Sequence, residues 1–144
     1  GVTAHIRDVA DRFAKAGYTA VAPAFFDYVE NDVELDYDKA GMERGKELAM
    51  EVGLDRAVEA VASAAESIRS SGKIGVVGYC WGGTVAWLAA SRLSGLAAAV
   101  PYYGGGMPNF MDESPKCPVL CHFGERDKSP SPASTTFPSP AIWR

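Results

Sequence analysis

The feature that most constrains this sequence is the five-residue turn Gly78-Tyr79-Cys80-Trp81-Gly82. It has the form of the G-x-S-x-G nucleophile elbow, with the sulfur of Cys80 in place of a hydroxyl oxygen. In such an elbow, small residues two positions before and after the nucleophile let a strand and a helix approach each other. The pattern therefore predicts a strand before the turn, a helix after it and an exposed thiol between them.

The helix expected after this turn would influence the reactivity of Cys80. The amino end of a helix carries unpaired N–H groups and a partial positive charge, which favour a thiolate and a developing oxyanion. The N–H of Trp81 is the candidate oxyanion donor. A buried structural cysteine in a glycine-rich turn is the alternative interpretation of Cys80. A nucleotide-binding loop is disfavoured, because G-x-G-x-x-G and G-K-[ST] patterns are absent.

Helical patterns alternate with short apolar runs along the rest of the chain. Apolar spacing predicts helices over about 2–14, 43–51, 54–70 and 84–93, and strands over 18–22, 73–77, 96–103 and 119–123. This alternation is typical of an α/β fold with a mostly parallel sheet and helices on both faces. Residues 129–140 contain four prolines among Ser and Thr, a composition that suits neither a helix nor a central strand. We expect a partial domain over 1–128 and a Ser/Pro-rich non-domain tail over 129–144.

Charge and cysteine content exclude several classes of protein. The 144-residue chain has a formal net charge of −4 and no basic cluster, so neither nucleic acid nor an anionic membrane is an expected partner. No apolar stretch approaches the roughly 20 residues that span a bilayer. Three cysteines without framework spacing favour neither a disulfide scaffold nor a zinc site. We expect a cytoplasmic, reduced protein without a metal.

Asp127 is the candidate acid of a catalytic triad. It follows the expected strand 119–123, and in this type of triad the nucleophile precedes the acid, which precedes the histidine. An Asp that caps local amides in a turn is the alternative interpretation. The two histidines, His5 and His122, both precede Asp127. The sequence thus supplies a nucleophile and an acid, but no histidine in the required position.

The segment 75–83, together with 16–18, 21–23, 102–104 and 122–127, resembles the dienelactone hydrolases (carboxymethylenebutenolidases). The resemblance runs from about Gly1 to Asp127. It implies an α/β-hydrolase fold and hydrolysis of an ester or lactone by a Cys-His-Asp triad, without a cofactor. In this family Cys80 would be the nucleophile and Asp127 the acid. The implied partner is a small-molecule ester or lactone substrate.

The same resemblance implies that parts of the family site are missing. Arg44 matches a family arginine that binds the substrate carboxylate, although an exposed helix-start residue is the equal alternative. A glutamate before the first helix, the second oxyanion donor and the triad histidine have no counterpart. We therefore expect a chain truncated at both ends, lacking N-terminal strands and a C-terminal strand and helix, with little or no turnover.

Two rival functions remain open at this point. One is a general carboxylester or thioester hydrolase with the same fold. The other is a catalytically dead, hydrolase-like fragment or binding module, which the missing histidine favours. The sequence predicts neither the substrate nor the oligomeric state.

Overall fold

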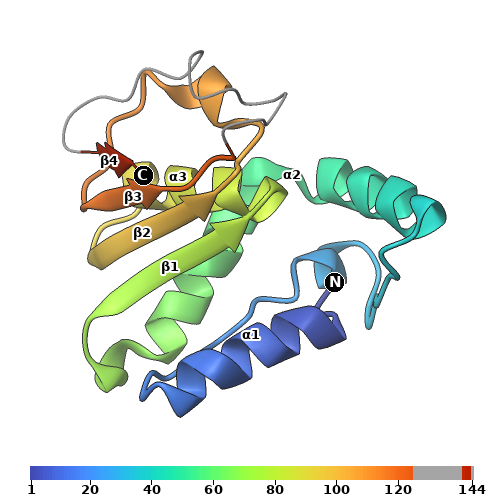
Figure 1. Ribbon diagram of the computed structural model, residues 1–144, viewed down its shortest axis with the longest axis horizontal. Helices are drawn as coiled ribbons and strands as arrows, with labels where there is room; N and C mark the ends of the chain where they lie inside the picture. Colours follow the sequence, from blue (N-terminus) through green and yellow to red (C-terminus); the bar gives the residue numbers. More distant parts are fainter. Residues whose placement is uncertain (125–140, 144) are drawn as a thin grey trace. The chain divides into compact units, whose positions relative to one another are not determined.

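The structure is a computed structural model that describes residues 1–124 and 141–143 (Figure 1). The chain divides into two compact units, Gly1–Ser71 and Gly72–Arg144. In the described part of the chain, every helix is too short or too polar to cross a membrane.

The first unit begins with helix α1, Ala4–Lys15, which confirms the helix expected there. Thr3 caps it, because the Thr3 hydroxyl accepts a hydrogen bond from the N–H of Ile6 at 3.5 Å. Gly17 follows with a φ of 94°, a left-handed conformation that commonly ends helices. The boundaries of α1 thus follow from local sequence signals.

The prediction of a strand at 18–22 is wrong, because this segment is irregular. Its apolar side chains are not buried, since Tyr18 is 66% and Val21 46% exposed. A strand needs a hydrogen-bonded neighbour, and the described residues of the first unit contain no other strand that could pair with it. A short apolar run alone therefore does not make a strand.

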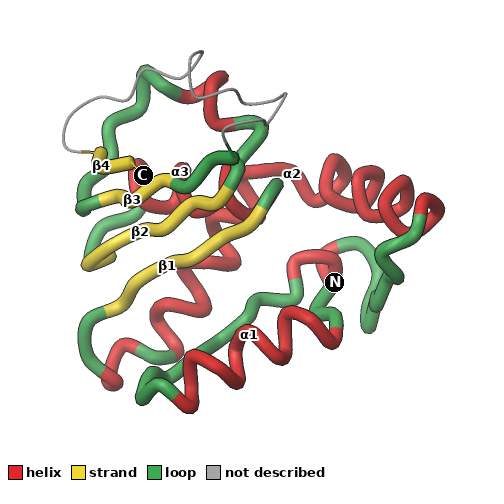
Figure 2. Tube along the Cα trace, in the orientation of Figure 1, coloured by secondary structure: helices red, strands yellow, loops and turns green. Residues whose placement is uncertain are grey.

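Helix α2, Lys39–Ser67, joins the two helices expected at 43–51 and 54–70. Asp38 caps it by accepting a hydrogen bond from the N–H of Gly41 at 2.7 Å. Gly53 interrupts the helix with φ 73° and ψ 162°, values that glycine adopts without steric cost. Two short 3-10 helices complete this unit, η1 at Phe25–Tyr28 and η2 at Arg69–Ser71 (Figure 2).

The second unit contains a parallel sheet of four strands in the order β1-β2-β3-β4 (Figure 1). The strands are β1 (Ile74–Tyr79), β2 (Leu96–Tyr102), β3 (Val119–Cys121) and β4 (Ala141–Trp143). The first three confirm expected strands. The fourth lies inside the range expected as a non-domain tail, where apolar residues follow the last proline. The boundary at residue 128 lies outside the described residues and stays a prediction.

Helix α3, Trp81–Arg92, packs against β1 and β2. It starts three residues before the expected 84, because the turn after β1 leads directly into the helix. Its residues Val85, Ala86, Trp87, Leu88 and Ala89 are at most 1% exposed. A helix buried this completely forms the centre of the unit's apolar core.

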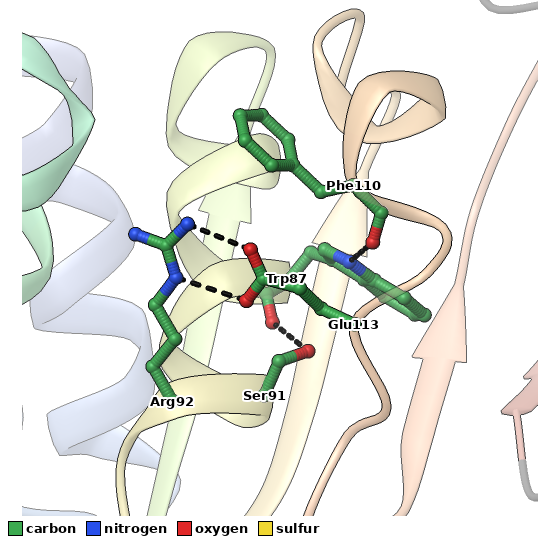
Figure 3. Close-up of polar contacts among 5 residues, drawn as sticks. All are labelled: Trp87, Ser91, Arg92, Phe110 and Glu113. Carbon is green, nitrogen blue, oxygen red and sulfur yellow. Dashed lines mark hydrogen bonds and ion pairs between the residues drawn. The ribbon is translucent and has the colours of Figure 1, made fainter.

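The segment after β2, which includes the 3-10 helix η3 (Met107–Phe110), is bound to α3 through residues drawn in Figure 3. The indole N–H of Trp87 donates to the carbonyl of Phe110 at 3.1 Å, and the Ser91 hydroxyl donates to the carbonyl of Trp87 at 3.0 Å. The Arg92 guanidinium donates to both oxygens of Glu113, at 2.9 and 2.7 Å. These bonds lower the pKa of Glu113 and keep its carboxylate charged. The helix behind the candidate nucleophile is thus fixed to its surroundings.

Candidate active site

Cys80 occupies the turn between β1 and α3 with φ 54° and ψ −119°. A positive φ is uncommon for a residue with a Cβ, and it is the strained conformation of a nucleophile elbow. The N–H of Cys80 donates to the carbonyl of Tyr102 at 3.0 Å. Its carbonyl accepts from the N–H groups of Gly83 (2.9 Å) and Thr84 (3.3 Å). The backbone is held on both sides, and the thiol is exposed rather than buried.

Glycines at this turn allow β1, α3 and the end of β2 to approach closely. A Cβ on Gly78 would collide with the carbonyl of Gly82, so the expected need for a small residue there is confirmed. The prediction that Gly82 must also be small is wrong, because a Cβ there would meet nothing within 4 Å. The small residue is required at Gly83 instead, since a Cβ added there would lie 2.5 Å from the carbonyl oxygen of Tyr102.

Trp81 is the first residue of α3 and follows Cys80 directly. Backbone N–H groups in the first turn of a helix point away from the helix and carry the positive end of its dipole. Trp81 therefore lies where an oxyanion donor would be needed. Its role as donor stays a prediction, as does that of Asp127, which lies outside the described residues.

Arg44 belongs to the first unit, whereas Cys80 belongs to the second. The Arg44 guanidinium lies 2.7 Å from the Glu30 carboxylate and 3.2 Å from that of Glu47. These hydrogen bonds, first with Glu30 and then with Glu47, raise the pKa of Arg44. The guanidinium is therefore occupied by two acidic partners, and substrate binding by Arg44 stays a prediction.

The surroundings of Arg44 are acidic. It lines an open hollow of about 330 Å³ together with Glu34, Asp36 and Asp38. A substrate carboxylate in this hollow would meet like charges, which costs electrostatic free energy. The hollow therefore suits a carboxylate ligand poorly.

Three rings stack across the strand ends next to Cys80. The rings of Tyr79 and Tyr102 lie 5.0 Å apart at 28°, and those of Tyr102 and His122 lie 4.4 Å apart at 10°. Tyr79 is opposite Tyr102 in the sheet, and Tyr102 bridges to His122, so the three side chains share one face. This stack was not predicted from the sequence. Its signal is a ring-bearing residue within two positions of the end of three expected strands, namely Tyr79, Tyr102 and His122.

The two histidines lie apart from any acid–base pair in the described residues. The ring of His122 stacks on Tyr102, and its backbone N–H donates to the carbonyl of Pro101 at 3.0 Å. His5 makes an edge contact with Tyr37 in the first unit, with ring centres 6.2 Å apart. Within residues 1–124 and 141–143, no group of three or more His, Cys, Asp and Glu could hold a metal ion.

We expect the three thiols to differ sharply in reactivity. Cys117 and Cys121 are buried, and desolvation raises both pKa values, that of Cys121 to about 12. Because only the thiolate is nucleophilic, these two thiols should stay inert well below those pKa values, whereas the exposed Cys80 reacts. Titration with a thiol reagent near neutral pH should detect one fast thiol in the native chain and three in urea.

The Cys80→Ser variant provides the control for this titration. It should lose the fast phase and keep the two thiols that appear on unfolding. Equal rates for all three native thiols would contradict the burial described here.

Comparison with known proteins adds sequence and structural relatives. The chain matches the model of the dienelactone hydrolase family over residues 1–137. It is 34% identical over 125 residues to a Synechocystis protein provisionally named carboxymethylenebutenolidase, covering 83% of this chain and 50% of that protein. It is also 34% identical over 134 residues to the carboxymethylenebutenolidase of Pseudomonas putida, covering 88% and 56%.

A solved structure agrees with these sequence matches. The chain superposes with a TM-score of 0.69 and 29% identity on a crystal structure from Klebsiella pneumoniae, provisionally named a dienelactone hydrolase. The match covers 93% of this chain and 60% of that one. The chain thus spans about half the length of the curated relatives it matches.

Proposed function

Because the chain belongs to the dienelactone hydrolase family, we propose that Cys80 is the nucleophile of an acyl transfer that cleaves an ester or lactone. The observation that carries this proposal is the conformation of Cys80. Its sulfur is exposed on a strained turn at the carboxyl end of β1 and at the amino end of α3. Open α/β sheets bind their ligands at this end of the strands.

In the proposed acylation step, the Cys80 thiolate attacks the carbonyl carbon of the substrate and forms a C–S bond. The carbonyl oxygen becomes an oxyanion, which the N–H of Trp81 and the dipole of α3 stabilise. Collapse of this intermediate breaks the C–O bond and releases an alcohol, or opens the ring of a lactone. Water then hydrolyses the thioester, releasing a carboxylic acid and regenerating the thiol.

Proton transfer is the weak part of the proposed reaction in this chain. Asp127 would orient the triad histidine, yet no histidine follows it in the sequence. Without this base, water is poorly activated and the leaving group is poorly protonated. We therefore propose that Cys80 is acylated slowly and that the thioester accumulates, with turnover reduced by several orders of magnitude.

The test is acylation by p-nitrophenyl acetate. We expect release of about one equivalent of p-nitrophenol, little further turnover, and an acetyl group located on Cys80 by peptide mapping. The Cys80→Ala variant should show neither the burst nor the adduct. An acetyl group on another residue, or no adduct at all, would refute Cys80 as the nucleophile. Rapid turnover that depends on Cys80 would refute the impairment.

A further inference from the structure

Helix α3 contains two buried hydroxyl groups, and they form different kinds of hydrogen bond. Thr84 is 2% and Ser91 is 7% exposed. The Ser91 hydroxyl donates within the helix, to the carbonyl of Trp87 at 3.0 Å. The Thr84 hydroxyl instead accepts a hydrogen bond from the N–H of Gly106 at 3.0 Å, although 22 positions separate the two residues in the sequence. Thr84 therefore joins the first turn of α3 to the glycine segment 104–106 that follows β2.

The glycine segment packs tightly against Thr84. A Cβ on Gly104 would lie 2.7 Å from the backbone nitrogen of Thr84. A Cβ on Gly106 would lie 3.0 Å from Cγ2 and 3.1 Å from Oγ1 of the same residue. Such a close approach leaves little room for water at the amide of Gly106, so the Thr84 hydroxyl supplies the acceptor that this amide needs.

Thr84 is connected to Cys80 by two routes. Along the helix, the N–H of Thr84 donates to the carbonyl of Cys80 at 3.3 Å. Across the sheet, the N–H of Cys80 donates to the carbonyl of Tyr102, two residues before the glycine segment. Cys80 has a φ of 54°, a conformation that persists only where the surroundings hold it. A displacement of the glycine segment would therefore loosen an acceptor that holds the strained residue.

We propose that Thr84 is a positioning residue of the Cys80 site. Its hydroxyl holds the glycine segment against α3, which keeps the Tyr102 carbonyl in place and Cys80 in its strained conformation. Without the hydroxyl, the turn relaxes and the sulfur moves away from the amino end of α3. The sulfur then loses part of the charge stabilisation that the helix supplies to a thiolate. This inference rests on the proposed role of Cys80 as the acylated residue.

The test measures acylation of Cys80 by p-nitrophenyl acetate in Thr84→Val, which keeps the shape of the side chain and loses the hydroxyl. We expect acylation to slow by about 10-fold, within the range that a small displacement of a reacting group causes. Thr84→Ala is a second variant without the hydroxyl and should be slowed likewise, with the advantage that alanine is the best helix former. Thr84→Ser keeps the hydroxyl and should restore most of the rate.

Hydrogen exchange followed by NMR gives a second readout, which loss of global stability alone would not produce. In Thr84→Val, the amide of Cys80 should exchange about 10-fold faster, because its acceptor on Tyr102 is no longer held in place. The amide of Leu93, at the other end of α3, donates to the carbonyl of Ala89 at 2.9 Å and should keep its exchange rate.

Ser91→Ala is the matched control, because it removes the other buried hydroxyl of the same helix and leaves the contact with the glycine segment intact. It should be acylated at the rate of the unmodified chain. The same rate in Thr84→Val and Thr84→Ala would overturn the role of Thr84 alone. So would a slower rate that the unfolded fraction accounts for, or one that Thr84→Ser fails to restore. No acylation of Cys80 in the unmodified chain would overturn the role of Cys80 as well.

Discussion

Replacing Gly83 with alanine is expected to lower the free energy of unfolding by about 3 kcal/mol, the upper end of the usual cost of overpacking. The added methyl would lie 2.5 Å from the Tyr102 carbonyl and 3.1 Å from Gly104, and both obstacles are backbone atoms. Such atoms cannot rotate away as a side chain can. The strand ends would have to separate from α3, which would also move Cys80.

Gly82→Ala is the matched control, one position away in the same helical turn. A methyl there meets nothing within 4 Å, and alanine has a higher helix propensity than glycine, by up to about 1 kcal/mol. We therefore expect Gly82→Ala to be neutral or stabilising. Urea titration followed by far-UV circular dichroism measures both variants. If Gly82→Ala were the more damaging of the two, the packing of this turn would differ from the one described.

Trp87→Ala is expected to cost about 3–5 kcal/mol, the range for removing a large aromatic side chain from a core. Trp87 is fully buried in α3, and its indole N–H donates to the carbonyl of Phe110. The substitution removes apolar contacts and leaves a cavity, and the carbonyl loses this donor. Because small proteins are stable by about 5–15 kcal/mol, the variant should be largely unfolded under mild conditions.

Two further variants separate these contributions. Trp87→Phe keeps most of the apolar volume and loses the indole N–H, so we expect a loss nearer 1–3 kcal/mol. Met50→Ala removes a side chain that is 79% exposed and should change stability by less than about 0.5 kcal/mol. A Trp87→Ala variant as stable as Met50→Ala would contradict the central place of α3 in the core.

Local signals predicted much of the second unit. The β-branched run before Gly78, the tight turn at Cys80 and the alanine-rich stretch after it predicted β1, the elbow and α3. Each of these signals depends on residues near in sequence, so one chain suffices to recognise them. The exposure of the candidate nucleophile followed from the same pattern.

Features that depend on distant partners were wrong or missed. The segment 18–22 has the composition of a strand but no strand partner within the described first unit. Gly83 has no room for a Cβ because the carbonyl of Tyr102, in another strand, lies against it, whereas Gly82 has room for one. The pairing of Arg92 with Glu113 joins residues 21 positions apart. Sequence periodicity carries no information on such contacts.

The hydrogen bond from the amide of Cys80 to β2 has a mechanistic consequence. That N–H already has an acceptor within the protein, at 3.0 Å, so it is a poor source of charge stabilisation for a reacting carbonyl. With the main chain clamped, rotation about χ1 is the principal freedom left to the sulfur. In the proposed reaction, a nucleophile held in this way would adapt little, and the ester would have to rotate into the line of attack.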